Sequence, residues 1–98
     1  MTVQIDPERT EIKHLQRIAD FQGKRVLEVG CGDGRLTWRY AGSAGLVTGI
    51  DLHPDDLRIA TVDLPSDLED KVFFARADSV YLPFVKKSFD IAVLAWSF

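Results

Sequence analysis

Short apolar runs alternate with amphipathic segments along the chain, and this alternation predicts a protein of the α/β class. Because the intervening segments have helical spacing, we expect the strands to lie parallel and to be joined by right-handed crossovers. A longer stretch without clear periodicity, residues 77–88, precedes the last run. The runs predicted to form strands are residues 25–29, 46–50, 72–76 and 89–96.

The first part of the chain carries the signals of a helix start. Asp6 can cap the free amides of a helix, and Pro7 suits its first position. An N-terminal helix is therefore predicted within residues 1–22. No repeat or low-complexity stretch divides the rest of the chain, so we expect residues 1–98 to form one domain, with residues 23–98 as its nucleotide-binding part.

Two more helices are predicted between the strands. One comes after the glycines at 30–34 and carries apolar residues such as Trp38 on one side. The other begins with Pro54 at its first position and ends before Pro65, because a residue that precedes proline disfavours helical backbone.

A glycine-rich turn directly succeeds the first predicted strand. The apolar run contains an acid, Glu28, and three glycines occupy alternate positions after it, Gly30, Gly32 and Gly34. A strand that breaks into a glycine turn and then opens a helix is typical of nucleotide-binding α/β sheets. A dinucleotide fingerprint would need its third glycine at position 35, where the chain has Arg35. The spacing therefore disfavours NAD.

An acid at the end of the second predicted strand is a second candidate binding residue. Asp51 lies about 20 residues after Gly30, the distance at which an acid can accept hydrogen bonds from both ribose hydroxyls of a nucleotide. Leu52 would then lie beside the adenine ring. The alternative is that Asp51 only begins a turn before the next helix.

Composition and charge exclude several classes of function. The net charge of −3 disfavours general binding of nucleic acid, which needs clustered lysine and arginine. The one cysteine, Cys31, excludes an intrachain disulfide and fits a reducing compartment. His14 and His53 are far apart in sequence, so no metal site is predicted. With no signal peptide and no apolar window of membrane-spanning length, we expect a cytoplasmic protein without a membrane partner.

The spacing E-x-G-x-G-x-G from Glu28 to Gly34 resembles the first motif of class I S-adenosylmethionine-dependent methyltransferases. The stretches 77–84 and 88–92 are similar to the later part of that family, and most of all to its small-molecule type 11 members, which include ubiquinone and menaquinone biosynthetic enzymes. The resemblance implies a Rossmann-like parallel sheet whose first four strands have the order 3-2-1-4.

The resemblance also implies that the cofactor is S-adenosyl-L-methionine. Asp78 would then face the adenine amine, and the Ser79 amide would face a ring nitrogen, unless Asp78 only caps a turn. Glu28 suits the cationic methionine tail, directly or through water. The loop backbone, rather than the Cys31 thiol, would approach the ligand closely, at Gly30, Cys31, Gly32 and Gly34.

The chain ends directly after the fourth predicted strand, whereas the family sheet continues with three more. We therefore expect an incomplete methyltransferase domain, truncated after that strand. Residues Ile91–Trp96 would form an uncovered edge, and such an edge is a template for association. This predicts a homodimer in which the fourth strands of two chains pair.

The predicted function is transfer of a methyl group from S-adenosylmethionine to a small-molecule acceptor. No catalytic residue is predicted, because positioning alone can supply much of the rate of such a displacement. Two alternatives remain open at this point, a non-catalytic module that binds the cofactor and an NAD-binding oxidoreductase.

Overall fold

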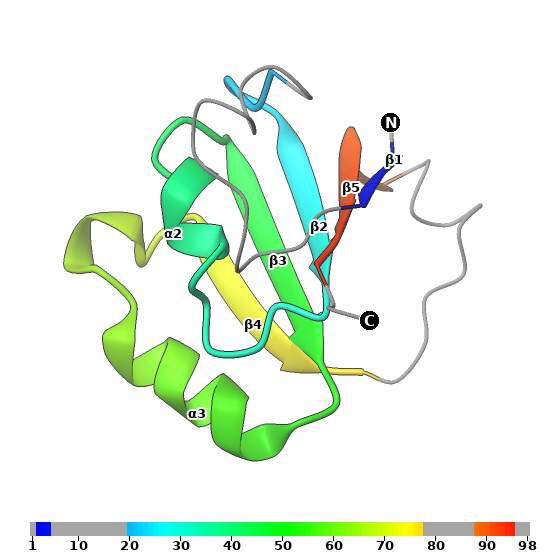
Figure 1. The fold of residues 1–98 in the computed structure, drawn as a ribbon. Helices are drawn as coiled ribbons and strands as arrows, with labels where there is room; N and C mark the ends of the chain where they lie inside the picture. Colours follow the sequence, from blue (N-terminus) through cyan, green and yellow to red (C-terminus); the bar gives the residue numbers. More distant parts are fainter. Residues whose placement is uncertain (1, 5–19, 78–87, 96–98) are drawn as a thin grey trace.

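The computed structural model describes residues 2–4, 20–77 and 88–95. They form a five-stranded sheet of order β1-β5-β2-β3-β4, in which every neighbouring pair is parallel (Figure 1). The strands are β1 (Thr2–Gln4), β2 (Arg25–Val29), β3 (Leu46–Asp51), β4 (Val72–Arg76) and β5 (Ile91–Leu94).

The predicted fold class is confirmed by four of these strands. β2, β3, β4 and β5 are the first to fourth predicted strands, and their spatial order β4-β3-β2-β5 is the predicted order 3-2-1-4. The bounds of β2 and β4 coincide with the apolar runs that predicted them. β5 covers Ile91–Leu94, and Trp96 at the end of its predicted range lies outside the described residues.

The expectation that the fourth predicted strand is an uncovered edge is wrong. β1 pairs with β5 on the side away from β2, with Thr2 opposite Ala92 and Gln4 opposite Leu94. The backbone of β5 is therefore hydrogen-bonded on both sides, and a homodimer through this strand loses its physical reason. The predicted N-terminal helix from Asp6 falls mostly on residues 5–19, outside the described part of the chain.

The helices lie where the sequence places them. α2 (Thr37–Tyr40) comes after the glycine turn, α3 (Pro54–Asp63) has proline at its first position, and the 3-10 turn η1 (Ser66–Leu68) leads into β4. In Figure 1, α2 and α3 lie over the same face of the sheet. Within the described residues, none of the helices has the length and apolar character that crossing a bilayer requires.

The main hydrophobic core fills the space between this face and the helices. Successive residues of a strand point to opposite faces, so Val26 of β2 faces the helices and Leu27 faces the other side. The smaller second cluster consists of Leu27, Ile50 and Ala92. The buried residues of the main cluster are Phe21, Val26, Leu36, Tyr40, Ala41, Ala44, Val47, Leu68, Val72, Ile91, Val93 and Ala95.

A charged pair connects the start of β2 to the residue before β5. The Asp90 carboxylate accepts hydrogen bonds from the Arg25 backbone amide at 2.9 Å and from the Arg25 guanidinium at 3.2 and 3.3 Å. In return, the Asp90 amide donates to the Arg25 carbonyl at 2.8 Å. These hydrogen bonds lower the pKa of Asp90 to about 2. The pair fixes the register of two strands that are distant in sequence.

Candidate functional site

The candidate site lies at the edge of the sheet where the strands end. Val29 of β2 is level with Ile50 of β3 and with Leu94 of β5, so three parallel strands reach this edge together. The chain leaves β2 toward β3 on one side, whereas β5 packs on its other side. Open α/β sheets bind ligands at such a switch point, beyond the carboxyl ends of the strands.

The glycine loop runs from this edge to α2 and adopts the conformation that its glycines predict. Gly30, Gly32 and Gly34 have φ angles of 80°, 56° and 91°. Among the described residues, positive φ occurs at no residue other than glycine. The loop is anchored on β3, because the amides of Gly30 and Cys31 both donate to the Ile50 carbonyl, at 2.9 and 3.1 Å.

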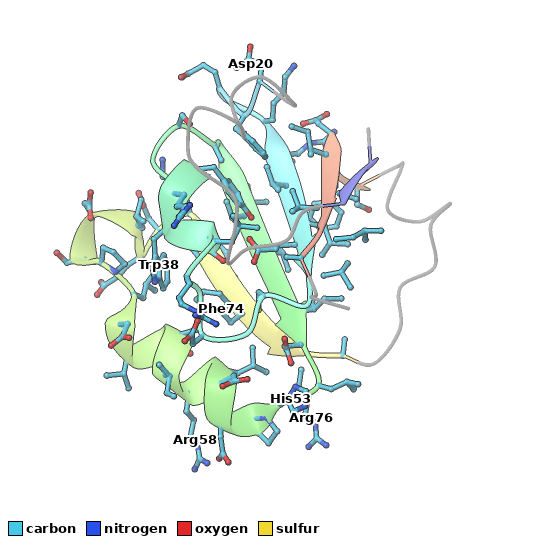
Figure 2. The ribbon with its side chains drawn as sticks, viewed as in Figure 1. Asp20, Trp38, His53, Arg58, Phe74 and Arg76 are labelled. Carbon is cyan, nitrogen blue, oxygen red and sulfur yellow. The ribbon has the colours of Figure 1, made fainter. Side chains whose placement is uncertain are left out.

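Gly34 also supplies space for an aromatic ring. A Cβ atom at this position would lie 2.5 Å from Cζ2 of Trp38. The Trp38 ring meets Phe74 of β4 edge to face, with ring centroids 5.7 Å apart, and both residues are labelled in Figure 2. The glycine loop therefore packs against the Trp38–Phe74 pair, and the close approach of the Trp38 ring requires glycine at position 34.

The structure brings Asp51 and the glycine loop together, as the spacing predicted. Asp51 Oδ2 accepts a hydrogen bond from the Gly32 amide at 2.8 Å. Its Oδ1 lies 2.9 Å from both the backbone amide and the ring Nδ1 of His53. Burial raises the pKa of Asp51, but the hydrogen bonds from His53 and Gly32 prevail and lower it overall, so the carboxylate is ionised. The contact with His53 was not predicted from the sequence.

Of the three residues predicted to contact adenine, the structure describes Leu52. Leu52 comes directly after Asp51, and its side chain is 50% exposed, which is unusual for a leucine beside a buried strand. The Ala77 amide donates to the Asp51 carbonyl at 3.1 Å, so the chain leaves β4 next to this site. Asp78 and Ser79 lie outside the described residues.

Glu28 is enclosed between β2 and α2. Its side chain is 0% exposed, and its Oε1 accepts hydrogen bonds from the Thr37 hydroxyl at 3.1 Å and from the Tyr40 hydroxyl. Burial raises the pKa of Glu28 to about 7, although both hydrogen bonds act to lower it. The contacts of Glu28 with Thr37 and Tyr40 were not predicted from the sequence. The signal available was an acid at an inward-facing strand position, with two hydroxyl side chains three residues apart on the next helix.

Cys31 lies in the glycine loop, and the predicted approach of its backbone to the ligand stays a prediction. Its thiol is buried and lies 3.8 Å from the Gly32 carbonyl. Burial, together with the nearby Glu28 and Asp51, raises the pKa of the thiol, so it stays protonated. A protonated, buried thiol is a poor nucleophile.

Three side chains at the site also have the composition of a metal-binding group. Asp51, His53 and Asp56 place possible ligand atoms within 4.8 Å of one another. Both oxygens of Asp51 already accept hydrogen bonds, one of them from the Gly32 amide, and His53 is 75% exposed. Asp51 is thus already hydrogen-bonded within the protein, and exposed acidic groups such as these are common without a metal ion.

Comparison with known proteins gives the same family as the motif. Residues 26–98 match the methyltransferase domain family. The demethylmenaquinone methyltransferase of Lactococcus lactis is 30% identical over 87 residues, which are 86% of this chain and 34% of that protein. The methyltransferase GfsG of Streptomyces halstedii is 34% identical over 93 residues, which are 88% of this chain and 34% of that protein.

One similar solved structure contains S-adenosyl-L-homocysteine, the form of the cofactor left after methyl transfer. The RNA methyltransferase from Salinibacter ruber, crystallised with S-adenosyl-L-homocysteine, has a TM-score of 0.60 and 27% identity over 68% of this chain and 46% of that one. The present chain spans about a third of the length of the two curated relatives (34% of each). The family match nevertheless covers most of the chain. The chain therefore belongs to the methyltransferase domain family, which confirms its resemblance to S-adenosylmethionine-dependent methyltransferases.

Proposed function

We propose that this chain is the cofactor-binding part of a methyltransferase that transfers a methyl group from S-adenosylmethionine to a small molecule. The observation that carries the proposal is the contact between the Gly32 amide and the Asp51 carboxylate. Two residues predicted separately, from a loop motif and from a distance along the chain, meet at the carboxyl edge of the sheet. This is the edge at which doubly wound sheets bind nucleotides.

The residues of this edge suit the nucleoside part of the cofactor. Asp51 is ionised and can accept hydrogen bonds from the ribose hydroxyls, in exchange for those it accepts from Gly32 and His53. The exposed Leu52 offers an apolar surface to the adenine ring. In the proposed complex the cofactor supplies an electrophilic methyl group on its sulfonium, and the protein contributes mainly position and orientation.

The proposed acceptor class is supported by relatives and by charge. One relative is named a demethylmenaquinone methyltransferase, whereas a structural neighbour is an RNA methyltransferase. The net charge of −3 favours the small molecule, because an RNA substrate would require a basic surface. We also propose a cytoplasmic location, in agreement with the reduced and buried Cys31.

Binding is tested first by calorimetry with S-adenosylhomocysteine and, separately, with NAD. We expect binding of S-adenosylhomocysteine alone. The family match does not favour the oxidoreductase alternative, and binding of NAD without S-adenosylhomocysteine would contradict the proposal.

The role of Asp51 is tested by Asp51→Asn, with Asp63→Asn as a matched control. Asp63 is an exposed acid at the far end of α3, so both variants lose one negative charge. A hydrogen bond to a charged group contributes about 1.5–3 kcal/mol, so Asp51→Asn should weaken S-adenosylhomocysteine binding about 10- to 100-fold. Equal affinities of the two variants would refute the ribose assignment.

Activity is tested separately from binding. Incubation with S-adenosylmethionine and a panel of phenolic, quinol and RNA acceptors should give methylation of the phenolic or quinol compounds. Binding of cofactor without turnover of any acceptor would favour the non-catalytic alternative, and methylation of RNA alone would overturn the acceptor class.

A further inference from the structure

The Asp51 carboxylate accepts three hydrogen bonds within the protein. Its Oδ2 accepts one of them, from the Gly32 amide at 2.8 Å. Its Oδ1 accepts the other two, both at 2.9 Å and both from His53, one from the backbone amide and one from ring Nδ1. Because an ionised carboxylate can only accept, Nδ1 carries the hydrogen in this contact.

The two oxygens of Asp51 are unequally occupied. Each carboxylate oxygen has two lone pairs, so the whole group can accept about four hydrogen bonds. Both lone pairs of Oδ1 are used by His53, whereas Oδ2 keeps one beside the bond from Gly32. A ribose presents two adjacent hydroxyl groups, and a carboxylate can accept such a pair with one hydroxyl on each oxygen. Of the exchanges open to Asp51, only the one at Oδ1 is therefore required.

The two donors on Oδ1 differ in how easily they can leave. The His53 amide is part of the backbone that connects β3 to α3, and a backbone amide that loses its partner costs free energy. The His53 ring belongs to a side chain that is 75% exposed, so water can replace its bond to Asp51 when the ring turns away (Figure 2). The ring is therefore the donor that leaves at the lower cost.

We propose that the His53 ring is a displaceable placeholder for one ribose hydroxyl of the cofactor, and thus a positioning residue of the site. This rests on the proposed function. Before the cofactor binds, the ring and the two amides hold the Asp51 carboxylate in one orientation. When the nucleoside binds, the ring turns into solvent and a ribose hydroxyl donates to Oδ1 in its place. No covalent bond changes in this step.

Because the ring competes with the ribose, its removal should strengthen binding. His53→Ala removes the ring and keeps the backbone amide on Oδ1. The contribution of an exposed pair corresponds to about a 1.5- to 5-fold change in affinity, and calorimetry should show S-adenosylhomocysteine bound more tightly by this factor. Arg58→Ala is the matched control, because it removes an exposed partner of Asp55 on α3 and leaves Asp51 unchanged. It should bind with wild-type affinity.

Two further comparisons show whether the ring acts through Asp51 and the ribose. In an Asp51→Ala background the carboxylate is gone, so adding His53→Ala should change the affinity no further. An analogue of S-adenosylhomocysteine that lacks both ribose hydroxyls cannot take the place of the ring. The wild type and His53→Ala should therefore bind this analogue equally. A variant that only disturbed the fold would affect both ligands alike.

The ring itself can be followed by nuclear magnetic resonance of isotopically labelled histidine. The chain has two histidines, His14 and His53, so a His14→Gln protein gives the ring signals of His53 alone. Saturation with S-adenosylhomocysteine should move the Nδ1 signal toward its position in the ligand-free protein that also carries Asp51→Ala, where the ring has no carboxylate to bind. A signal that does not move would show that the ring stays on Asp51, and would overturn the proposal.

The outcomes separate the placeholder role from the proposed function. If His53→Ala binds S-adenosylhomocysteine as the wild type does, or more weakly, the placeholder role is wrong. The proposed function then still stands, provided that Asp51→Asn weakens binding and Asp63→Asn does not. If the wild type does not bind S-adenosylhomocysteine, both proposals are wrong. Should His53→Ala fail to fold, the ring signal of His53 decides the matter.

Discussion

Replacing Gly34 by alanine should destabilise the protein for two reasons that can be measured separately. The first is backbone strain, because Gly34 has φ of 91°, and positive φ costs an L-residue about 1–2 kcal/mol. The second is a clash, because the new Cβ would lie 2.5 Å from Cζ2 of Trp38. Moving that ring disturbs its edge-to-face contact with Phe74, which contributes about 0.5–1.5 kcal/mol. We expect a total loss of about 1.5–3.5 kcal/mol.

Two other glycines provide the controls. A Cβ at Gly23 would meet no atom within 4 Å, yet its φ is 69°, so Gly23→Ala should show the strain alone, about 1–2 kcal/mol. Gly42 has neither a positive φ nor a neighbour within 4 Å, and Gly42→Ala should change stability by less than about 0.5 kcal/mol. The three variants therefore differ in one physical factor at a time.

The assay is urea unfolding monitored by the far-ultraviolet circular dichroism of the folded chain. With a denaturant dependence of about 1–3 kcal/mol per molar urea, Gly34→Ala should lower the midpoint by about 0.5–3.5 M relative to Gly42→Ala. If Gly34→Ala and Gly23→Ala unfold at the same concentration, the contact with Trp38 carries no energy and the predicted clash is refuted.

Burial and charge lead to four further predictions. The pKa of Glu28 is raised to about 7 on folding, so its stabilising effect is complete below its unfolded pKa and is lost as pH rises through 7. Glu28→Gln should remove this loss, about 3 kcal/mol between pH 4 and pH 8, in unfolding measured across that range. The pKa of Asp90 is lowered to about 2, so its contribution is present above about pH 4 and is lost as pH falls toward 2. Acid unfolding of Asp90→Asn should lack this dependence, and an unchanged acid profile would contradict it. Cys31 should react with a thiol reagent at least about tenfold faster in urea than in the folded protein. Leu52→Ser should change stability by less than about 0.5 kcal/mol because the side chain is half exposed, while it weakens S-adenosylhomocysteine binding several-fold.

The sequence predicts β2, β3, β4 and β5 well because each is an apolar run with clear ends. The bounds of β2 and β4 are the predicted ones, although β4 lies at the edge of the described sheet and has only Val72 buried. β1 could not be found in this way. It has three residues, too few for a pattern, and what makes it a strand is its pairing with β5 at a distant place in the chain.

The part of the candidate site that depends on the spacing of residues along the chain was predictable from the sequence. Gly32 and Asp51 meet because the loop motif and the strand lengths set their positions. The environment of Glu28 was not predictable in the same way, because it depends on how α2 packs on β2. Thr37 and Tyr40 belong to a four-residue helix and face inward, and their hydroxyls find the acid only after the chain has folded.

The pairing of β1 with β5 also constrains how the protein is made. Thr2 and Ala92 are joined across nearly the whole length of the chain, so this pairing has a large loop-closure cost. During synthesis, residues 2–4 emerge before β5, which is their pairing partner in the described sheet. The β2-β3-β4 part can assemble in the meantime through neighbouring crossovers. Because β5 is its only described neighbour, β1 can join the sheet only once β5 is in place, so the part of the sheet farthest apart in sequence is completed last.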